Sequence, residues 1–160
     1  MHNQSIIPFP QEDGIDVDVG KLTNVGISRT YINRLSDPYS SCLSVLDEQS
    51  SSQNDILLEM YEQIQTNQLN VYQQDYCLKI CEQHFTLAQC GCYSYSLKSL
   101  NISELAHEEG CLTPSQIECF EQSNELFLNS DEIDTCYVKC PLECNQVRYE
   151  LKANSADYPS

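Results

Sequence analysis

Apolar and polar residues alternate in two stretches of this chain, and alternation is typical of β-strands that are covered on one face. The first stretch spans residues 22–35 and the second spans residues 146–152. The apolar faces consist of Val25, Ile27 and Tyr31 in the first stretch and of Val147, Tyr149 and Leu151 in the second. Arg29 interrupts the first face, whereas the second is regular. The pattern predicts a strand near each end of the chain.

Between these stretches the apolar period changes to that of a helix. The longest helical stretch, residues 69–88, places five side chains along one stripe: Cys77, Ile80, Cys81, His84 and Ala88. Cys90 follows Cys81 by nine residues, which is about half a turn out of phase with it. We therefore expect a central helix whose thiols point in two directions and which is bridged on two sides.

A second main helix begins with three residues typical of helix starts: Thr113 at the N-cap, Pro114 at the first position and Gln116 closing a capping box. It should end near Asn129. A shorter helix is expected over residues 55–64, and the Ser-, Gln- and acid-rich residues 46–55 are expected to form a mobile link. Two strands flanking these helices predict an α+β fold.

Composition indicates the compartment and the kind of partner. Ten cysteines among 160 residues is an even count, at a density typical of disulfide-rich proteins from oxidising compartments. The net charge is −16, from 24 acidic and eight basic residues. This charge argues against binding to nucleic acid or anionic lipid and favours cations or basic peptides as partners.

No apolar run approaches the roughly 20 residues that a membrane-spanning helix needs. Residues 1–8 also lack the charged and apolar segments of a signal peptide. Because an oxidised domain must reach an oxidising compartment, we expect the chain to be an excerpt of a longer protein. Asn3 and Asn101 begin candidate N-glycosylation sequons, which agrees with an extracellular location.

The spacing of the cysteines leaves three uses open. A catalytic thiolate beside a histidine (His2, His84 or His107) needs a free cysteine, which an even count does not predict. Structural zinc usually takes C-x2-C pairs, whereas the spacings here are C-x3-C and C-x-C. Disulfides are the favoured interpretation, so we expect no enzyme activity, no metal and no cofactor.

Ten cysteines allow about 945 pairings, and helical geometry favours some of them. Cys77 and Cys81 lie on one helical face, and Cys136 and Cys140 have the same separation. A nested antiparallel ladder would join Cys77 to Cys140 and Cys81 to Cys136. Four helical residues rise about 6 Å whereas four extended residues cover about 13 Å. The segment from Cys136 to Cys140 must then be coiled or slanted for both bridges to close.

The order of the cysteines and of a few neighbours forms a longer signature. Its parts are Pro38-Tyr39-Ser40-Ser41-Cys42, Tyr72-(x4)-Cys77-(x3)-Cys81-(x8)-Cys90-Gly91-Cys92, Cys111-(x7)-Cys119, Cys136-(x3)-Cys140-Pro141-Leu142-Glu143-Cys144-(x4)-Tyr149 and Tyr158-Pro159-Ser160. This signature resembles the degenerin/epithelial sodium channel family, which includes acid-sensing and peptide-gated channels. The resemblance covers essentially residues 2–160.

The resemblance implies a disulfide-rich extracellular fragment. Residues 1–41 would form partial palm strands and a linking turn, residues 42–144 a thumb with two helices, and residues 145–160 a returning palm strand. The implied bridges are Cys42–Cys144, Cys77–Cys140, Cys81–Cys136, Cys90–Cys119 and Cys92–Cys111. In the family, both transmembrane helices, the finger and the ion filter lie outside the matched part.

The resemblance also implies a function. The parent protein would be a stimulus-gated, sodium-selective channel of the plasma membrane, assembled as a homo- or hetero-trimer, and this extracellular part would couple outside events to the pore. Pro38, Tyr39 and Tyr72 match family positions expected to take part in this coupling. Tyr39 matches the aromatic residue of the turn that meets the first transmembrane helix.

The acidic face of the second main helix bears on the stimulus. Glu121 and Glu125 match a thumb carboxylate pair of acid-sensing members, in which repulsion from facing acids favours protonation. The facing positions are matched here by Ser5 and Ile6, which supply no such repulsion. We expect that protons alone do not open the channel and that a peptide or another ligand does.

A secreted disulfide-rich binding or inhibitor module is the alternative, because the same cysteine density occurs in such proteins. The sequence on either side of this chain separates the two hypotheses. Apolar segments of about 20 residues on both sides would support a channel.

Overall fold

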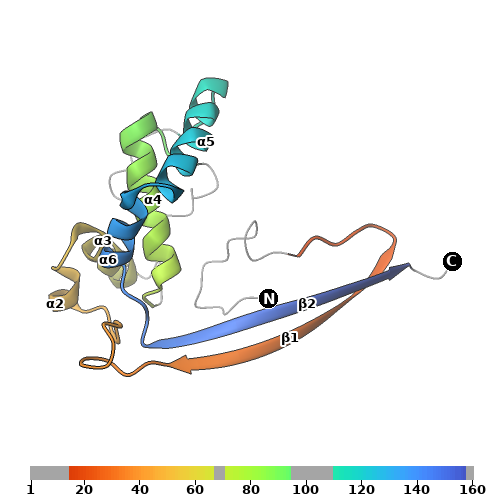
Figure 1. Ribbon diagram of the computed structural model, residues 1–160, viewed down its shortest axis with the longest axis horizontal. Coiled ribbons are helices and arrows are strands. Elements are labelled where there is room, and N and C mark those ends of the chain that lie inside the picture. Colours follow the sequence, from red (N-terminus) through yellow and green to blue (C-terminus); the bar gives the residue numbers. More distant parts are fainter. Residues whose placement is uncertain (1–14, 67–70, 95–109, 158–160) are drawn as a thin grey trace.

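The computed structural model of the protein describes residues 15–66, 71–94 and 110–157. These residues form five helices and a two-stranded sheet: β1 (Lys21–Asn33), α2 (Glu48–Ser51), α3 (Asp55–Gln65), α4 (Gln74–Cys90), α5 (Pro114–Leu128), α6 (Asp131–Lys139) and β2 (Asn145–Asp157). The helices gather at one end, and the ribbon formed by β1 and β2 projects from them (Figure 1). The predicted α+β class is confirmed, while α2 and α6 go beyond the predicted elements.

The two strands pair antiparallel along their whole length, from Lys21 opposite Asp157 to Asn33 opposite Asn145. Directly opposite residues share a face of the sheet, so the two apolar faces predicted from the sequence coincide. Their cross-strand pairs are Val25 with Ala153, Ile27 with Leu151 and Tyr31 with Val147. β2 continues beyond its predicted end because its polar last residues pair with the start of β1.

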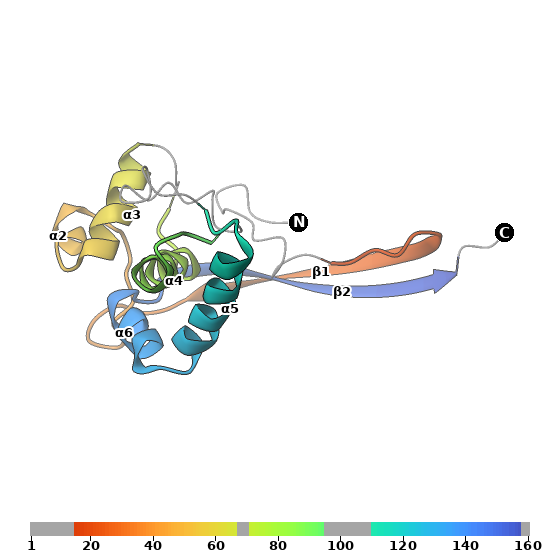
Figure 2. The same cartoon turned by 90° about the horizontal axis from the view of Figure 1, so that it is seen from above.

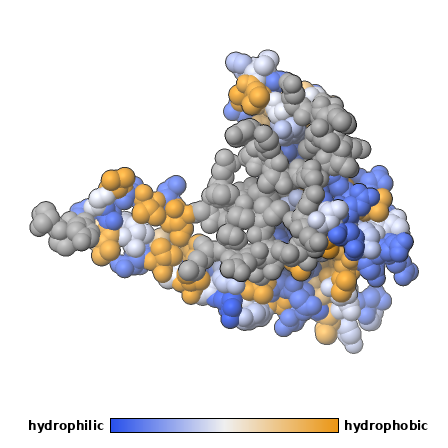
Figure 3. All heavy atoms as spheres, turned by 180° about the vertical axis from the view of Figure 1, so that it is seen from behind, coloured by the Kyte–Doolittle hydropathy of each residue, from blue (hydrophilic) through white to orange (hydrophobic). Residues whose placement is uncertain are grey.

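The apolar face of the ribbon remains partly open to solvent. Val25, Ile27 and Tyr31 are between 46% and 59% exposed. Figure 3 shows apolar residues along the projecting ribbon. Arg29, which interrupts the apolar pattern, lies over the ring of Tyr31 with its guanidinium carbon 4.7 Å from the ring centroid. A cation–π contact with Tyr31 thus accommodates the charged Arg29 on the apolar face of the ribbon.

Residues 46–55, which were expected to form a mobile link, instead contain the short helix α2. Asp47 caps the short helix α2 by accepting a hydrogen bond from the Ser50 backbone N–H at 2.8 Å, and the Ser50 hydroxyl accepts from the Asp47 N–H at 2.9 Å. Leu46 and Ser51 are buried. The polar residues that suggested a link instead serve as caps, because Asp and Ser satisfy the free N–H groups of a helix start.

The central helix α4 has the stripe that the spacing predicts, and its inner residues Cys77, Ile80 and Cys81 are buried. It begins at Gln74, later than the predicted residue 69, which lies outside the described residues. Gly91 ends it in a left-handed conformation with φ of 62° and donates its N–H to the Leu87 carbonyl. A glycine suits this position because it lacks the Cβ that disfavours positive φ.

Helix α5 starts as predicted, with Thr113 and Gln116 forming a capping box and Asn129 as C-cap. Helix α6 follows almost at once, capped by Ser130, whose hydroxyl accepts from the Glu132 N–H at 3.3 Å. Its first turn is acidic and its last turn contains Lys139, which complements the helix dipole. The segment that the ladder required to be coiled is therefore this helix, with Cys140 as its C-cap.

The core lies between the helices, and α4 is in the middle of the group with α3 on one side and α5 on the other (Figure 2). Ile56, Leu57 and Met60 of α3 belong to the same buried cluster as Tyr76 and Ile80 of α4. On the other side, Phe85 of α4 meets Phe127 of α5 with ring centroids 5.4 Å apart. The buried residues of this cluster are Leu46, Ile56, Leu57, Met60, Tyr72, Tyr76, Cys77, Ile80, Cys81, Phe127, Cys136 and Cys140.

Candidate functional site at the junction of helices and ribbon

Five disulfides brace the helices and tie them to the ribbon, and they use all ten cysteines. The pairs are Cys42–Cys144, Cys77–Cys140, Cys81–Cys136, Cys90–Cys119 and Cys92–Cys111. They are the same pairs that the family resemblance implies. No cysteine is free, and the described residues contain no cluster of His, Cys, Asp and Glu suited to a metal ion.

The nested ladder joins α4 to α6. Cys77 and Cys140 have Cα atoms 5.7 Å apart, and Cys81 and Cys136 have Cα atoms 6.0 Å apart. Cys77, Cys81 and Cys136 lie within helices and Cys140 caps one, so the cysteines on each side are separated by about 6 Å of rise and the two rungs match. The ladder fixes the two helices as one rigid pair, because neither can slide along the other without breaking a rung.

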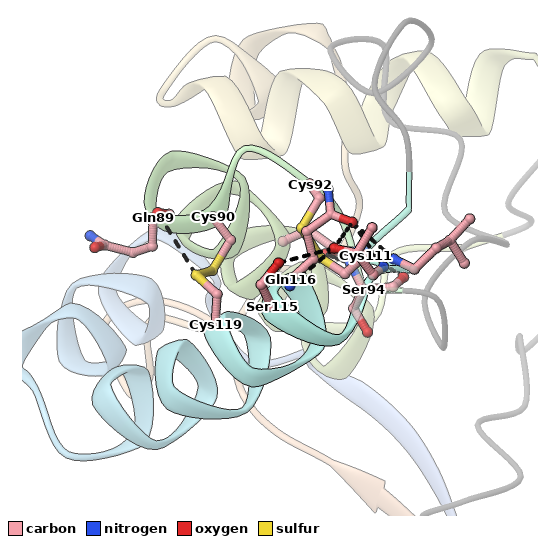
Figure 4. Close-up of a disulfide and its surroundings, with 11 residues drawn as sticks. Gln89, Cys90, Cys92, Ser94, Cys111, Ser115, Gln116 and Cys119 are labelled. Carbon is pink, nitrogen blue, oxygen red and sulfur yellow. Dashed lines mark hydrogen bonds between the residues drawn. A yellow bond between two sulfur atoms is a disulfide. The ribbon is translucent and has the colours of Figure 1, made fainter.

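The far end of α4 is joined to α5 by a second pair of bridges. Cys90, the last residue of α4, pairs with Cys119 of α5, and Cys92 pairs with Cys111 (Figure 4). The Cys111 N–H also donates to the Tyr93 carbonyl at 2.9 Å. Helix α4 is thus bridged at both ends and on two sides, as the phase difference between Cys81 and Cys90 predicts.

The junction between helices and ribbon is closed by the fifth bridge. Cys42 and Cys144 have Cα atoms 5.0 Å apart, one shortly after β1 and one immediately before β2. Backbone bonds flank the bridge: the Leu43 N–H donates to the Leu142 carbonyl at 2.7 Å, and the Cys144 N–H donates to the Leu43 carbonyl at 3.0 Å. All helices of the described residues lie between Cys42 and Cys144 in the sequence, so this junction is the base of the helical unit.

The three residues expected to couple gating occupy different settings. Pro38 and Tyr39 lie in the turn after β1, and Tyr39 is 78% exposed. Tyr72 belongs to the core, and its hydroxyl donates to the Pro141 carbonyl at 2.6 Å. Burial, aided by the negative charges of Glu143 and Asp75, raises the pKa of Tyr72 well above its usual range. The structure therefore presents Tyr39 to the outside and uses Tyr72 to hold the junction together.

The acidic face is located on α5. Glu121 and Glu125 are both exposed to solvent on this helix. Their expected facing positions, Ser5 and Ile6, lie outside the described residues. The glycosylation candidates Asn3 and Asn101 also lie outside them.

A polar seam between α3 and α4 goes beyond what the sequence predicts. Glu59 of α3 is buried and its Oε2 lies 3.0 Å from Nε2 of His84 on α4. Nearby, the Tyr76 hydroxyl donates to Oε1 of Gln63 at 2.8 Å. The position of His84 on the packed stripe of α4 was a signal that it faces another element, but the stripe does not identify the partner.

No helix in the described ranges combines the length and the apolar character needed to cross a bilayer. The disulfides, the helices and the sheet together define the class of the fold. It is an α+β unit in which a disulfide-bridged group of helices is joined to a two-stranded ribbon.

Comparison with known proteins identifies the family. The family model described as amiloride-sensitive sodium channel matches residues 1–160, and the chain belongs to this family. It is 25% identical to the epithelial sodium channel subunit beta of Bos taurus, 27% identical to the subunit alpha of Neoceratodus forsteri and 27% identical to degenerin del-1 of Caenorhabditis elegans. Each alignment covers all of this chain and 22–23% of the relative, so the chain spans less than a quarter of the length of these relatives.

Proposed function

We propose that the chain is the thumb and part of the palm of a stimulus-gated sodium channel subunit, and that it couples extracellular events to the gating of the pore. Residues 1–41 supply partial palm strands and the linking turn, residues 42–144 the bridged thumb, and residues 145–160 the returning palm strand. Membership of the amiloride-sensitive sodium channel family supports this assignment.

One structural observation carries the coupling role. The helical unit is stiffened internally by four disulfides and leaves the ribbon at a single base closed by Cys42–Cys144. A stiff body on a narrow base transmits a displacement at its far end to the base instead of absorbing it by internal rearrangement. The exposed Tyr39 lies in the turn between β1 and Cys42, where such a displacement would reach a neighbouring element.

The proposed setting is a trimer of like or related subunits in the plasma membrane, with this part on the extracellular side. Relatives are named as alpha, beta and gamma subunits of the epithelial sodium channel, which supports assembly from several chains. The net charge of −16 suits an extracellular surface that meets cations and basic peptides.

The test is expression of the full-length protein in a cell that lacks such currents. We expect an amiloride-sensitive inward sodium current when a basic peptide is applied, and apolar segments of about 20 residues on both sides of this part. An open reading frame with a signal peptide upstream and no apolar segment on either side would instead identify a secreted binding module.

A further inference from the structure

The start of α4 is capped by a residue far away in the sequence. Its own N-cap residue, Gln73, makes no side-chain capping bond. Instead the Gln74 N–H donates to Oε1 of Glu143 at 3.0 Å, and Nε2 of Gln74 donates to the Cys140 carbonyl at 2.7 Å. A carboxylate is favourable here because the first N–H groups of a helix lack partners and its dipole is positive at this end.

The same Glu143 is held from the ribbon side. Arg34 follows directly after β1, and its Nη1 donates to the Glu143 carbonyl at 2.8 Å. Its Nη2 donates to Oε1 of Gln146 on β2 at 3.2 Å, and its backbone N–H donates to the Cys144 carbonyl at 2.7 Å. A planar guanidinium with several donors fixes both strand ends at once, which the single ammonium of a lysine does less well.

These contacts form one continuous chain of bonds. It leads from the Arg34 guanidinium to the main chain of Glu143, through the Glu143 side chain, and to the backbone of Gln74 at the first turn of α4. The bridge Cys42–Cys144 does not reach α4, and Cys77–Cys140 reaches it only beyond the first residues of the helix. The bonds through Glu143 therefore connect the ribbon to the very start of α4.

We propose that Arg34, Glu143 and Gln74 form a clasp that sets how α4 meets the ribbon, and that Arg34 and Glu143 are positioning residues for gating. This inference rests on the proposed function. We call these three residues the Arg34 clasp. The neighbouring disulfides keep the elements attached, so the clasp can open and close without separating them.

The carboxylate of Glu143 is bonded in a way that favours opening of its contact with the start of α4. Its Oε2 is buried and has no hydrogen-bond partner among the described residues. A buried oxygen that lacks a partner loses its hydration without compensation. The carboxylate is thus held to α4 through one oxygen only, and release of the clasp would let the other oxygen regain water.

The first arm of the test measures hydrogen exchange of the full-length protein in a membrane mimetic, following the Gln74 amide and its neighbours in α4. Glu143→Ala should speed exchange of these amides about tenfold, as expected for a lost helix cap, whereas Glu143→Gln keeps an acceptor and should exchange nearly as wild type. Arg34→Met should also speed it, although the hydrogen bonds that the Arg34 guanidinium donates go to Glu143 and Gln146 and not to α4. Arg148→Met, an exposed arginine on β2, is the matched control and should have no effect.

Unchanged exchange at Gln74 in Arg34→Met, or an equal effect of Arg148→Met, would overturn the clasp. The second arm records the amiloride-sensitive sodium current evoked by a basic peptide, divided by the amount of channel labelled at the cell surface. It should fall by about threefold or more in Arg34→Met and Glu143→Ala, the range of coupling effects from residues between two sites. Glu143→Gln and Arg148→Met should leave it unchanged.

The outcomes separate the two proposals. Faster exchange with an unchanged current per surface channel would show that the clasp only supports the fold, and would overturn its role in gating. A wild-type channel that reaches the surface and carries no amiloride-sensitive sodium current, either at rest or with the basic peptide applied, would overturn the proposed function, and the gating role of the clasp with it. The exchange results decide the existence of the clasp in either case.

Discussion

At the scale of single residues, two tyrosines of the family signature, Tyr39 and Tyr72, have opposite surroundings. Tyr39 is 78% exposed, whereas Tyr72 is 9% exposed and donates to a main-chain carbonyl. An exposed aromatic residue is available to a neighbouring element, and a buried, hydrogen-bonded one stabilises its own fold. Substitutions at the two positions should therefore affect different measurements.

Tyr39→Ala should leave the amount of channel at the cell surface unchanged and slow or abolish gating. Because the ring is mostly exposed, its loss should remove a contact to a neighbouring element of the channel instead of core packing. Surface labelling and current recordings from the same cells measure the two effects. Tyr137→Ala, at a half-exposed tyrosine of α6, is the control and should gate normally; normal gating in Tyr39→Ala would remove Tyr39 from the mechanism.

Tyr72→Phe should reduce stability by about 1 kcal/mol, the usual net contribution of one hydrogen bond. The effect should depend on pH in a defined direction. Burial first, and then Glu143 and Asp75, raise the pKa of Tyr72 in the folded protein, so folding favours the neutral phenol. Its contribution is present below the unfolded pKa of about 10 and is lost as the pH rises above it.

Thermal unfolding of the full-length protein between neutral pH and about pH 11 measures this effect, because tyrosine ionises in that interval. Wild type should lose more stability at the alkaline end than Tyr72→Phe does. Equal losses in both proteins would show that the Tyr72 phenol is not the group responsible. Tyr31→Phe, on the exposed ribbon, is the matched control.

At the scale of elements, the sequence predicted the helices and strands that have a clear pattern in their own residues. It missed elements that are short or that form only against a distant partner. The alternating strands, α4 and the capped start of α5 follow from spacing and cap residues. Helix α6 is only nine residues long, and an apolar pattern as short as that of Ile133, Cys136 and Tyr137 does not distinguish a helix from a coiled connection. The polar end of β2 forms a strand only because the start of β1 lies opposite.

The candidate site divides in the same way. The ladder of α4 and α6 follows from equal cysteine spacing, but the bridges at Cys42, Cys90 and Cys92 were predicted only from the family resemblance, since helical phase alone leaves many pairings open. The Glu143 cap of α4 lies 69 residues from Gln74. No pattern within one segment shows a contact over such a separation.

Loss of the junction bridge should be the most damaging loss of a disulfide. Cys42 and Cys144 are 102 residues apart, for which the chain-entropy model gives about 4.7 kcal/mol. Cys92 and Cys111 are 19 residues apart, for which it gives about 3 kcal/mol. Cys42→Ser should therefore reduce surface expression of the full channel more than Cys92→Ser does.

Surface labelling compares the two variants, and peptide mapping without reduction identifies the bridges in the wild type. Mapping should recover the five pairs named above. Free thiols at Cys77, Cys81, Cys136 and Cys140 would contradict the ladder, and a milder defect in Cys42→Ser than in Cys92→Ser would contradict the importance of the junction.

At the scale of the whole molecule, the chain combines a bridged helical unit, an open ribbon and a strong negative charge. Its apolar ribbon face is about half exposed, and its relatives are more than four times as long. The charge of −16 is spread over a surface with few basic residues. Net charge alone therefore does not identify the stimulus. Proton sensing depends on which acidic side chains face one another.

We predict that protons alone do not open the parent channel. Glu121 and Glu125 are one helical turn apart on α5 and both exposed, so water screens their mutual repulsion. The positions expected to face them are Ser5 and Ile6, which carry no charge. Carboxylates sense mild acid when neighbouring charge or burial favours the protonated form, and the exposed pair has no burial to provide this.

Stepping the bath of cells that express the full-length protein from neutral to mildly acidic pH tests this prediction, and we expect no large, rapid sodium current. A basic peptide should open the channel at constant neutral pH, because the negative surface attracts cationic ligands. The control is Glu118→Gln with Glu132→Gln, which removes two other exposed acids from α5 and α6. An acid-evoked sodium current that is suppressed by Glu121→Gln with Glu125→Gln, and not by the control, would show that this pair senses protons after all.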